Sequence, residues 1–510
     1  MLSKVFGFGL LGLEAYPIEI EVDINRGLPS VTIVGLPDNV VKESKERVKS
    51  AIKNSGFDYP ADRITVNLAP SDIKKEGSAF DLPIALGILA ASKQISPEKL
   101  KDYILLGELA LDGTVRPIKG VLIIAFATSQ TKLSKLLLPK DNAKEAALVE
   151  NIQAYPIKTL SQLVHFITDE SSLEPVKVNT EELFANSLNY EVDFADVKGQ
   201  IQAKRGLEVA VAGAHNILLI GPPGTGKTML AKRIPTIMPD MCLEEALETT
   251  KIHSILGMVP PKTGMISTHP FRSPHHTSSD VAIVGGGQFP KPGEVSLAHN
   301  GVLFLDELPE FHRDVLESLR QPLEDGLVNI SRAAKSMSFP SKFMLVCAMN
   351  PCPCGYFTDP KKECRCSSTK IQNYLSKISG PLLDRIDIHI EVHSLRYKEL
   401  AAEQKCESSQ DIKKRINKAR KIQRDRFKNE NIFANSQMNH KQIKKYCSIN
   451  EESKELLEMA MNEFNFSARA YDKILKISRT IADLAEKGEI MPEHISEAIQ
   501  YRSLDRNLWI

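Results

Sequence analysis

The chain has almost no net charge, no long apolar run and few cysteines for its length. Its 510 residues carry a formal net charge of +1, which gives no global field that would draw the protein onto nucleic acid. Any contact with a polyanion must therefore come from local patches. No run of about 18 uninterrupted apolar residues is present, which argues against a membrane span. Eight cysteines in so long a chain do not indicate a disulfide framework.

The amino terminus lacks the features of a secretion signal. Residues 1–13 are apolar and glycine-rich with a single lysine, and they run into Glu14 without a small-residue cleavage site. The composition is that of an ordinary globular protein, with 42% hydrophobic and 25% charged residues and no low-complexity tract. These features together predict a cytoplasmic protein that does not contact a membrane.

A chain of 510 residues is too long for a single hydrophobic core, and its patterns predict a multidomain α/β protein. Residues 1–167 mix strand-like and helical segments, which predicts an α+β domain, and the polar, patternless residues 168–192 are typical of a linker. In residues 193–394, apolar strands alternate with helical stretches, as in a parallel sheet flanked by helices. Residues 395–510 are helical in period, which predicts a small helical domain.

Finer patterns in the first domain predict individual elements. Asp38 is expected to cap a helix that begins at Asn39 and closes at Gly56. Asp112-Gly113 predicts a hairpin turn. Alternating or apolar runs predict three strands and one apolar helix. The strands are Ile18–Val22, Ile64–Leu68 and Ile104–Leu111, and the helix is Ala79–Ala91.

The clearest motif is a phosphate-binding loop, which directly follows the apolar strand Ile217–Ile220. Glycines in such a loop let backbone N–H groups converge on the β-phosphate, and the next helix adds the partial positive charge of its N-terminus. Lys227 is expected to bridge the β- and γ-phosphates of ATP, and the Thr228 hydroxyl to bind Mg²⁺. An ordinary turn would not match all eight positions. They are Gly221, Pro222, Pro223, Gly224, Thr225, Gly226, Lys227 and Thr228.

Two further apolar strands end in polar residues. Val302–Leu305 runs into Asp306, which fits a ligand of Mg²⁺, and Glu307, which fits the base that polarises the attacking water. Phe343–Ala348 runs towards Asn350, whose amide is expected to orient that water or to contact the γ-phosphate. The alternative for the amide is a turn-forming role before the proline that follows it.

Two arginines are candidates to complete the site. Arg385 lies in Ser379-Gly-Pro-Leu-Leu-Asp384-Arg385, and a guanidinium there can stabilise transition-state charge at a neighbouring site. A surface pair of Asp384 with Arg385 is an equal alternative. Arg469 follows Ser467-Ala468 at the predicted start of a helix and matches the pattern called sensor 2.

Four of the eight cysteines fall within fifteen residues. Their spacing is Cys-x-Cys-x₉-Cys-x-Cys, which is tighter than the usual Cys-x₂-Cys. Four thiolates suit a tetrahedral structural Zn²⁺ better than any hard cation. We predict a zinc site, with reduced cysteines on a surface loop as the alternative. The residues are Cys352, Cys354, Cys364 and Cys366.

Three basic segments are candidates for DNA contact. The insertion 255–297 carries Arg272, His275, His276 and Lys291 as candidates to contact a DNA strand. The adjacent pair His275-His276 is not predicted to bind metal, because no third ligand is obvious. A hairpin predicted over residues 328–339 carries Arg332 and Lys335 near its tip, with a solvated hairpin as the alternative. Residues 411–430 predict a basic helix with one packed face, which we interpret as a solvated surface.

With these motifs in place, the whole chain resembles the ComM/YifB family of magnesium-chelatase-like AAA+ ATPases. The resemblance implies a homo-hexamer that uses ATP and Mg²⁺, in which Arg385 and Arg469 act on ATP bound by an adjacent protomer. It also implies a motor that promotes branch migration on single-stranded and branched DNA during homologous recombination and natural transformation, with recombination proteins as candidate partners. The stretches that carry it are residues 21–29, 33–38, 75–83, 272–276, 285–288 and 350–355.

The N-terminal domain resembles the proteolytic domain of the Lon family, which implies a ribosomal S5 domain 2-like fold. Lon-type proteases use a serine in a G-P-S-A-G-like turn and a later lysine. Here Ala79 stands at the position of the nucleophile and Leu122 at that of the lysine, while Ser78 is one residue away without a predicted base. We therefore predict no protease activity. The resemblance leaves a second function open, namely a magnesium-chelatase-like ATPase that remodels a protein complex.

Overall fold

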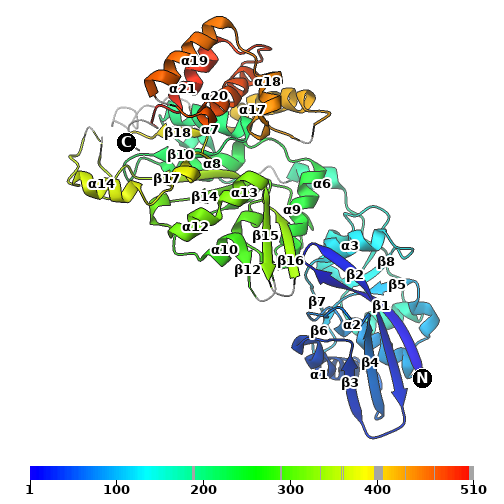
Figure 1. The fold of residues 1–510 in the computed structure, drawn as a ribbon. Helices are drawn as coiled ribbons and strands as arrows, with labels where there is room; N and C mark the ends of the chain where they lie inside the picture. Colours follow the sequence, from blue (N-terminus) through cyan, green and yellow to red (C-terminus); the bar gives the residue numbers. More distant parts are fainter. Residues whose placement is uncertain are drawn as a thin grey trace. The chain divides into compact units, whose positions relative to one another are not determined.

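The computed structural model of the chain (Figure 1) describes residues 1–510 with the exception of 187–189, 288–289, 333–334, 358, 360, 395–405, 431, 465 and 505–510. The chain forms two compact units. The first comprises Met1–Ser187 and Leu243–Ser267, and the second comprises Leu188–Cys242 and Thr268–Ile510. Within the described ranges, no helix is long and apolar enough to cross a membrane.

The first unit is built on a seven-stranded sheet with the strand order β3-β4-β2-β1-β5-β8-β9. Strand β2 pairs antiparallel with β1 and β4, whereas the remaining neighbours pair in parallel. Side chains Ile18, Ile20 and Val22 of β2 are fully buried, as the period-two pattern predicts. The bounds are β1 (Leu2–Leu11), β2 (Glu14–Asn25), β3 (Ser30–Val34), β4 (Arg63–Ala69), β5 (Tyr103–Leu105), β8 (Lys135–Pro139) and β9 (Gln153–Ile157).

Helices pack on this sheet largely where the sequence predicts them. Asp38 caps α1 (Asn39–Asn54) by accepting a hydrogen bond of 2.7 Å from the Val41 N–H, and Gly56 follows in a left-handed conformation. Helix α2 (Asp81–Ala91) is buried along its whole length, which is why its sequence is apolar on every side. Further helices of this unit are α3 (Val121–Ser129), α4 (Ala143–Ala146), α5 (Leu160–Ile167) and α9 (Leu243–Leu256).

Two elements of the first unit differ from the sequence prediction. The predicted strand Ile104–Leu111 is broken, because β5 ends at Leu105 and β6 (Glu108–Leu109) pairs instead with β7 (Val115–Arg116) in a separate hairpin. The break follows from Gly107, whose N–H donates to the Ala79 carbonyl rather than continuing the ladder. The predicted linker contains the short helix α6 (Thr180–Asn186).

The segment Leu243–Ser267 packs with the first unit, although it follows the phosphate-binding loop in sequence. The Ser254 hydroxyl donates to the Glu145 carboxylate, and the Ser254 carbonyl accepts a hydrogen bond of 2.9 Å from the Gly120 N–H. Lys251 Nζ lies 3.8 Å from the centroid of the Phe126 ring. The domain boundaries drawn from the sequence stay predictions, and in the structure α9 packs against helix α3 of the first unit.

The second unit contains a five-stranded, fully parallel sheet with the order β11-β14-β17-β10-β18. Its three central strands are buried on both faces, as their continuous apolar sequences require. The predicted parallel sheet is thereby confirmed. The bounds are β10 (Ile217–Ile220), β11 (Phe271–Arg272), β14 (Val302–Leu305), β17 (Met344–Met349) and β18 (Ile388–Glu391), with α7 (Ile201–Gly213) before β10 and α8 (Lys227–Ile237) after it.

Short elements connect these strands. The predicted hairpin is present as β15 (Leu327–Arg332) and β16 (Lys335–Pro340), in which Arg332 and Lys335 are backbone partners at the tip end. A second small hairpin pairs β12 (Gly285–Gly286) with β13 (Lys291–Pro292). The connecting helices include α10 (Asp280–Val284), α11 (Glu294–Leu297), α12 (Arg313–Ser318), α13 (Arg320–Asp325), α14 (Ser368–Leu375) and α15 (Gly380–Leu383).

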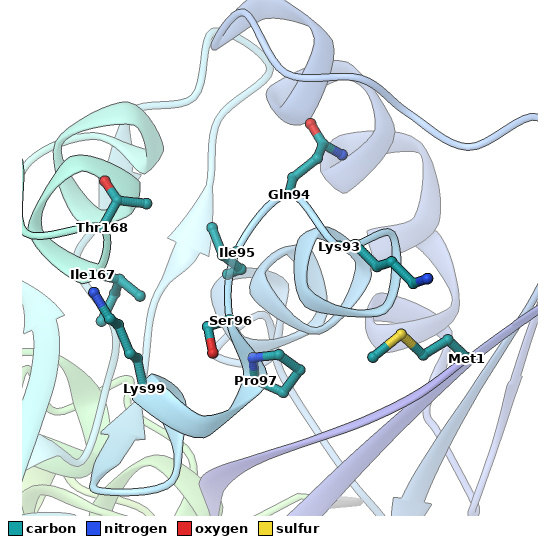
Figure 2. Close-up of a pocket in the computed structure, with 9 residues that line it drawn as sticks. All are labelled: Met1, Lys93, Gln94, Ile95, Ser96, Pro97, Lys99, Ile167 and Thr168. Atoms are coloured by element: carbon teal, nitrogen blue, oxygen red, sulfur yellow. The ribbon is translucent and has the colours of Figure 1, made fainter.

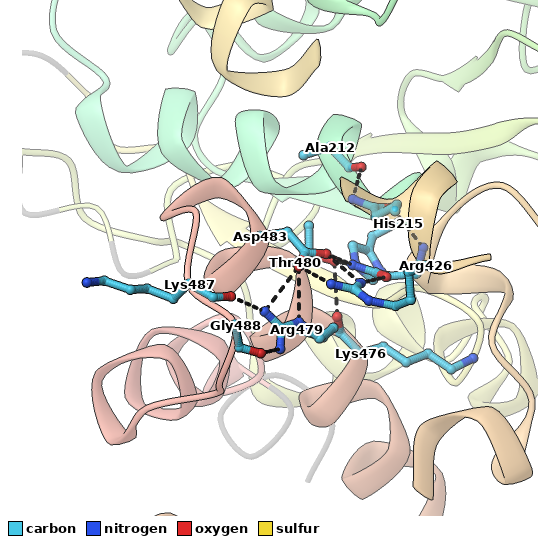
Figure 3. Close-up of polar contacts among 11 residues, drawn as sticks. Ala212, His215, Arg426, Lys476, Arg479, Thr480, Asp483, Lys487 and Gly488 are labelled. Carbon is cyan, nitrogen blue, oxygen red and sulfur yellow. Dashed lines mark hydrogen bonds and ion pairs between the residues drawn. The ribbon is translucent and has the colours of Figure 1, made fainter. Parts of the chain in front are cut away.

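The C-terminal residues form the predicted group of helices, drawn from orange to red in Figure 1. Figure 3 shows buried polar contacts at their centre, where Asp483 accepts from Arg426 and Arg479. Asp483 also accepts from the Asn435 side chain over 2.9 Å. His215, which follows α7, joins this network through Thr480, with 2.9 Å between Nε2 and Oγ1. The bounds are α17 (Ser409–Arg426), α18 (His440–Tyr446), α19 (Glu451–Phe464), α20 (Ala468–Leu484) and α21 (Pro492–Gln500).

Candidate functional site

The phosphate-binding loop lies between β10 and α8 and surrounds the amino group of Lys227. This group donates to the carbonyls of Gly221 and Pro222 over 2.6 and 2.9 Å, and to the Asn350 side-chain oxygen over 3.1 Å. Burial lowers the pKa of Lys227 to about 8, because desolvation penalises the charged form. The structure thus brings the predicted lysine and the predicted amide into direct contact.

A hydroxyl and a carboxylate meet beside this lysine. Thr228 Oγ1 donates to Asp306 Oδ2 over 2.6 Å, and Asp306 Oδ1 accepts from the Glu307 N–H over 3.0 Å. Strands β10, β14 and β17 are adjacent and parallel, so the residues that follow them meet at one edge of the sheet. Oxygen donors of this kind suit Mg²⁺.

Glu307 has a left-handed backbone conformation with φ of +55°, which is unusual for a residue with a side chain. Such a conformation costs on the order of 1–3 kcal/mol and is held by the surrounding structure. The Glu307 side chain is 57% exposed, and its Oε2 lies 3.6 Å from His276 Nδ1. The carboxylate therefore faces solvent beside the site, with an imidazole next to it.

Two features of the loop were missed by reasoning from the sequence. Gln200 Nε2 donates to the Thr225 carbonyl over 3.1 Å and to the His393 carbonyl over 2.8 Å, which links the loop to the start of α7 and the end of β18. At Gly221, an added Cβ would lie 2.2 Å from the Val392 carbonyl oxygen, so the motif glycine is also required for packing. No local motif marks Gln200, because its partners are distant in sequence.

The two predicted arginines are linked through Asp384, the neighbour of Arg385 in sequence, which pairs with Arg469 at the start of α20. Arg385 donates to the Pro381 carbonyl over 2.5 Å and pairs with Glu324, and its side chain is 12% exposed. Arg469 Nη1 lies 3.2 Å from Asp384 Oδ2 and its side chain is 68% exposed. The surface pair considered for Asp384 is therefore made by Arg469. Among the described residues, the polar partners of the two arginines are Pro381, Glu324 and Asp384, and none of these belongs to the phosphate-binding loop.

Helix α20 holds the segment that carries Arg385. Lys473 Nζ donates to the Ile386 carbonyl over 3.0 Å and lies 3.2 Å from Asp387 Oδ1, while His215 Nδ1 lies 3.5 Å from Asp387 Oδ2. Burial opposes the charge of Asp387, yet Lys473 and His215 hold the pKa of that carboxyl well below its usual range. The arginine segment and α20 are thus joined by a largely buried ion pair, whose Lys473 and Asp387 side chains are 13% and 14% exposed.

The four predicted cysteines converge on one point. Their sulfur atoms lie within 4.8 Å of one another, and Cys352 Sγ is 3.3 Å from Cys354 Sγ and 3.7 Å from Cys364 Sγ. A tetrahedral Zn²⁺ with Zn–S bonds of about 2.3 Å places its sulfurs roughly 3.8 Å apart. The donor set and its spacing fit that ion. Together with Cys366, these residues could hold a metal.

The cysteine loop packs directly on the phosphate-binding loop. Gly355 has φ of +85°, and an added Cβ there would lie 2.6 Å from Pro223 Cδ. Cys352 is fully buried two residues after Asn350, the residue that contacts Lys227. The position of Asn350 is thus tied to the fold of the cysteine loop.

The candidate DNA-contact residues have different surroundings. Arg272 forms a bidentate ion pair with Glu294, with Nε–Oε2 and Nη2–Oε1 distances of 2.6 and 2.7 Å, whereas Lys291 is exposed on β13. The side chains of Arg332 and Lys335 lie outside the described residues. The structure therefore assigns a structural partner to Arg272, and DNA contact by any of the four stays a prediction.

The basic helix α17 uses much of its charge within the second unit. Lys413 pairs with Asp240 over 2.8 Å, Arg415 with Glu208 over 2.5 Å, and Arg426 with Asp483. Ile412, Ile416 and Ala419 form its buried face. These contacts fit the interpretation of this helix as a structural and solvated element.

The positions that resemble a protease site lie in the first unit. Ser78 donates to the Glu108 carboxylate, a partner that the sequence did not predict, and the Leu122 N–H donates to Glu145 Oε1 over 3.0 Å. A serine nucleophile is normally activated by an imidazole or an amine, so a carboxylate at Ser78 does not restore the Lon arrangement. Figure 2 shows a separate cavity of about 390 Å³ in this unit, lined by residues that include Met1, Lys93 and Lys99. It shares no residue with the phosphate-binding loop.

Proteins of two bacteria are similar to the chain over almost its whole length. Competence protein ComM of Haemophilus influenzae is 44% identical over 517 residues, which cover 99% of this chain and 98% of that protein. The uncharacterized protein YifB of Escherichia coli is 44% identical over 512 residues, with the same coverage. The chain belongs to the ComM/YifB family of magnesium-chelatase-like AAA+ proteins.

Family matches divide the ComM/YifB chain into three parts. Residues 193–400 match magnesium chelatase, subunit ChlI, residues 20–142 match subunit ChlI of Mg-chelatase, and residues 406–502 match magnesium chelatase, subunit ChlI C-terminal. Lon protease of Brevibacillus choshinensis is 26% identical over 166 residues, which cover 30% of this chain and 21% of that protein. The predicted family and fold class are confirmed, and the family implies a nucleotide and Mg²⁺.

Proposed function

We propose that this ComM/YifB protein is a hexameric ATPase that couples ATP hydrolysis to movement along DNA and promotes branch migration in homologous recombination and natural transformation. The observation that carries the ATPase proposal is the meeting of Lys227 with Asn350 and of Thr228 with Asp306 at one edge of a parallel sheet. The DNA proposal is supported by similarity over the full chain to a relative named competence protein.

Each residue of the site has a separate task in this proposal. Lys227 and the N-terminus of α8 bind the phosphates, and Thr228 with Asp306 would hold Mg²⁺. Bound Mg²⁺ neutralises charge that develops on the phosphate oxygens. Glu307 accepts the proton of the attacking water, and Asn350 orients that water. Because Lys227 and Asn350 touch, displacement of the lysine by phosphate would also release the amide.

The arginines complete the site from an adjacent protomer. Arg385 is held by the Pro381 carbonyl and by Glu324, and the exposed Arg469 pairs with Asp384. Both arginines and their partners belong to the second unit, which also contains α20. A guanidinium that reaches a neighbour's γ-phosphate stabilises charge in the transition state. This makes hydrolysis dependent on assembly.

The cysteine quartet holds a structural Zn²⁺ in this proposal. Four thiolates at the observed spacing match tetrahedral zinc, and the loop packs against Pro223 beside the phosphate-binding loop. The ion would fix the loop that carries Asn350, and it would take no part in the chemistry.

A second candidate function is remodelling of a protein complex, as the matches to magnesium chelatase subunits suggest. The pairing of Arg272 with Glu294 and of α17 with its acidic partners favours it, because these cations are used within the chain. Both functions share the same ATPase residues, so the nucleotide site does not separate them.

The test is the response of the purified protein to DNA. ATP turnover is measured alone and with single-stranded or forked DNA, and movement of a labelled strand is followed on three- and four-stranded junctions with ATP and Mg²⁺. We expect faster turnover on DNA and ATP-dependent strand movement. Turnover that DNA leaves unchanged, together with no movement on any junction, would transfer support to protein remodelling.

A further inference from the structure

Strand β3 forms one edge of the seven-stranded sheet, and within the described part of the chain β4 is its only neighbouring strand (Figure 1). Its sequence, Ser-Val-Thr-Ile-Val, contains no proline and no charged residue, and Ser30, Thr32 and Val34 are exposed. Such an edge offers unpaired backbone N–H and C=O groups to another strand, and proteins usually protect it with charge, proline or a covering segment. The edge at β3 has none of these protections among the described residues.

The opposite edge of the same sheet is protected. At β9 the Val176 N–H donates to the Ala154 carbonyl over 2.9 Å, so the segment after α5 occupies a backbone acceptor of this edge. Pro156 in the same strand has no N–H to offer. The sheet is thus closed at β9 and open at β3, which indicates that the open edge has an occupant.

Leu36, just beyond β3, is held in a strained and exposed position. Its φ is +54°, an outlier for a bulky residue that costs free energy, and it is 55% exposed. Its carbonyl accepts from the Lys75 N–H over 3.1 Å, and the Lys75 carbonyl accepts from the Asp38 N–H over 2.9 Å, which fixes the backbone there. Strain that keeps a leucine in solvent adds nothing to the core and points to a ligand. Leu28, before β3, is 89% exposed and extends this apolar surface.

Helix α1, which follows β3, carries a row of lysines on one side. Its other side is joined to α2 by the ion pair of Arg47 with Asp81, with 2.8 Å between Nε and Oδ2. At about 100° per residue, each lysine lies roughly 120–160° around the helix from Arg47. Because α2 packs against β1 and β2, the side of α1 turned away from α2 is the side of β3. The row is exposed and forms no ion pair with any described acidic residue, and it outnumbers the two exposed glutamates of the helix, Glu43 and Glu46. Its members are Lys42, Lys45, Lys49 and Lys53.

We propose that the edge of β3 binds an extended acidic peptide of a partner protein. The peptide adds to the sheet as a further strand, so that its backbone pairs with β3 and its apolar side chains contact Leu28, Val34 and Leu36. Its carboxylates lie near the lysine row of α1, which gives the surface its preference for acidic sequences. This inference is independent of the proposed ATPase function, because all of these residues belong to the first unit.

The probe is a short fluorescent peptide of alternating valine and glutamate, and its binding to the full-length protein is measured by fluorescence anisotropy. One matched peptide replaces glutamate by lysine, and another carries N-methylated valines that cannot donate backbone hydrogen bonds. The double variant Lys45→Glu with Lys49→Glu tests the charge. Leu36→Asn removes the apolar side chain, since asparagine tolerates the left-handed region. The control is Lys132→Glu with Lys158→Glu, two exposed lysines beside β8 and β9.

We expect the acidic peptide to bind wild type and the lysine and N-methylated peptides not to bind. The lysine double variant should weaken binding about tenfold and Leu36→Asn about fivefold, as loss of interfacial charge and of one apolar contact do. Leu36→Asn should melt at or above the wild-type temperature, because the backbone strain is relieved. Hydrogen exchange at the amides of β3 should slow when the peptide is bound. The control pair should bind as wild type.

Three outcomes overturn the proposal. The first is no binding of the acidic peptide, or equal binding in all folded variants. The second is equally tight binding of the N-methylated peptide, which would show that no strand is added. The third is another occupant. Oligothymidylate that displaces the peptide and is lost in the lysine double variant would assign the surface to a polynucleotide. Variants that change the sedimentation of the protein but not its peptide binding would assign it to a second copy of this chain.

Discussion

At the scale of single residues, the proposed nucleotide site assigns binding and chemistry to different residues. Lys227 is buried and surrounded by the Gly221 and Pro222 carbonyls, whereas Glu307 is 57% exposed and faces His276. A buried lysine is suited to holding phosphate charge, and an exposed carboxylate is suited to taking a proton from water. The two residues should therefore fail in different ways when they are replaced.

Lys227→Ala is expected to lose nucleotide binding, and Glu307→Gln is expected to bind ATP but hydrolyse it at least about 100-fold more slowly, as loss of a general base does. Binding is measured with a fluorescent ATP analogue and turnover by phosphate release. Equal, near-wild-type turnover in both purified variants would contradict the assignment.

A second prediction at this scale concerns Arg385. If it acts on the adjacent protomer, Arg385→Ala should abolish hydrolysis and leave ATP binding intact, and mixing it with Glu307→Gln should restore activity at interfaces that combine the intact halves. The matched control is Glu324→Ala, which removes the partner of Arg385 within the same chain. Loss of activity in the control equal to that of Arg385→Ala, or no recovery in mixed rings shown to form, would favour a structural role.

At the scale of elements, helix α20 and the segment before β18 are held by a buried pair and an exposed pair. Asp387 is the buried partner of Lys473, and Asp384 is the exposed partner of Arg469. Replacing one member of a buried pair leaves the other charge without compensation, which costs about 3–5 kcal/mol, whereas exposed pairs contribute about 0–1 kcal/mol. Replacing aspartate by asparagine should thus lower the free energy of unfolding much more at Asp387 than at Asp384, although the two positions are only three residues apart.

We expect Asp387→Asn to lower the free energy of unfolding strongly and Asp384→Asn to change it little, measured by urea unfolding. Because the pKa of Asp387 is lowered in the fold, its contribution is present at neutral pH and is lost as pH falls below the ordinary value of about 3.9. Wild type should therefore lose more stability than Asp387→Asn between about pH 5 and pH 3. Similar losses in both variants would show that the pair is not buried as described.

The cysteine loop is a second element whose disruption should affect the proposed nucleotide site. Purified protein should contain about one zinc per chain, and Cys354→Ser or removal of the metal by a chelator should lower both the melting temperature and ATP turnover. The effect on turnover follows from the packing of Gly355 on Pro223 and from the position of Asn350. Cys406→Ser, outside the quartet, should leave both unchanged. Metal-free protein with full thermal stability would remove the zinc site.

Local sequence patterns predicted the elements that depend on local chemistry. The cap at Asp38, the buried strands β10, β14 and β17, and the loop at Lys227 were found in this way, because period, capping and glycine spacing are short-range signals. The sequence patterns did not predict contacts between segments that are distant in sequence. His276 beside Glu307, Gln200 on the loop and the packing of α9 with the first unit depend on how the chain returns on itself, which no single pattern records.

At the scale of the whole molecule, the net charge of +1 means that DNA must be bound by particular cations and not by a general field. Several candidates are neutralised within the chain, among them Arg272 and much of α17. The hairpin of β15 and β16 places Arg332 opposite Lys335 at its end, which leaves this hairpin as the strongest candidate for contact with the phosphate backbone.

A motor that contacts only phosphates should bind DNA with little sequence preference and should weaken steeply as salt increases, because binding releases counterions. Replacing Arg332 and Lys335 by alanine should reduce the slope of log affinity against log salt by about 0.7 for each phosphate of a single strand that the protein no longer neutralises. DNA stimulation and strand movement should disappear while basal ATP turnover remains, since neither residue belongs to the phosphate-binding loop. The control is Lys418→Ala. This change removes a surface cation of α17 that already pairs with Glu486. If the hairpin variant keeps the wild-type salt slope and still moves strands, DNA is bound elsewhere, and the exposed Lys291 of β13 becomes the next residue to replace.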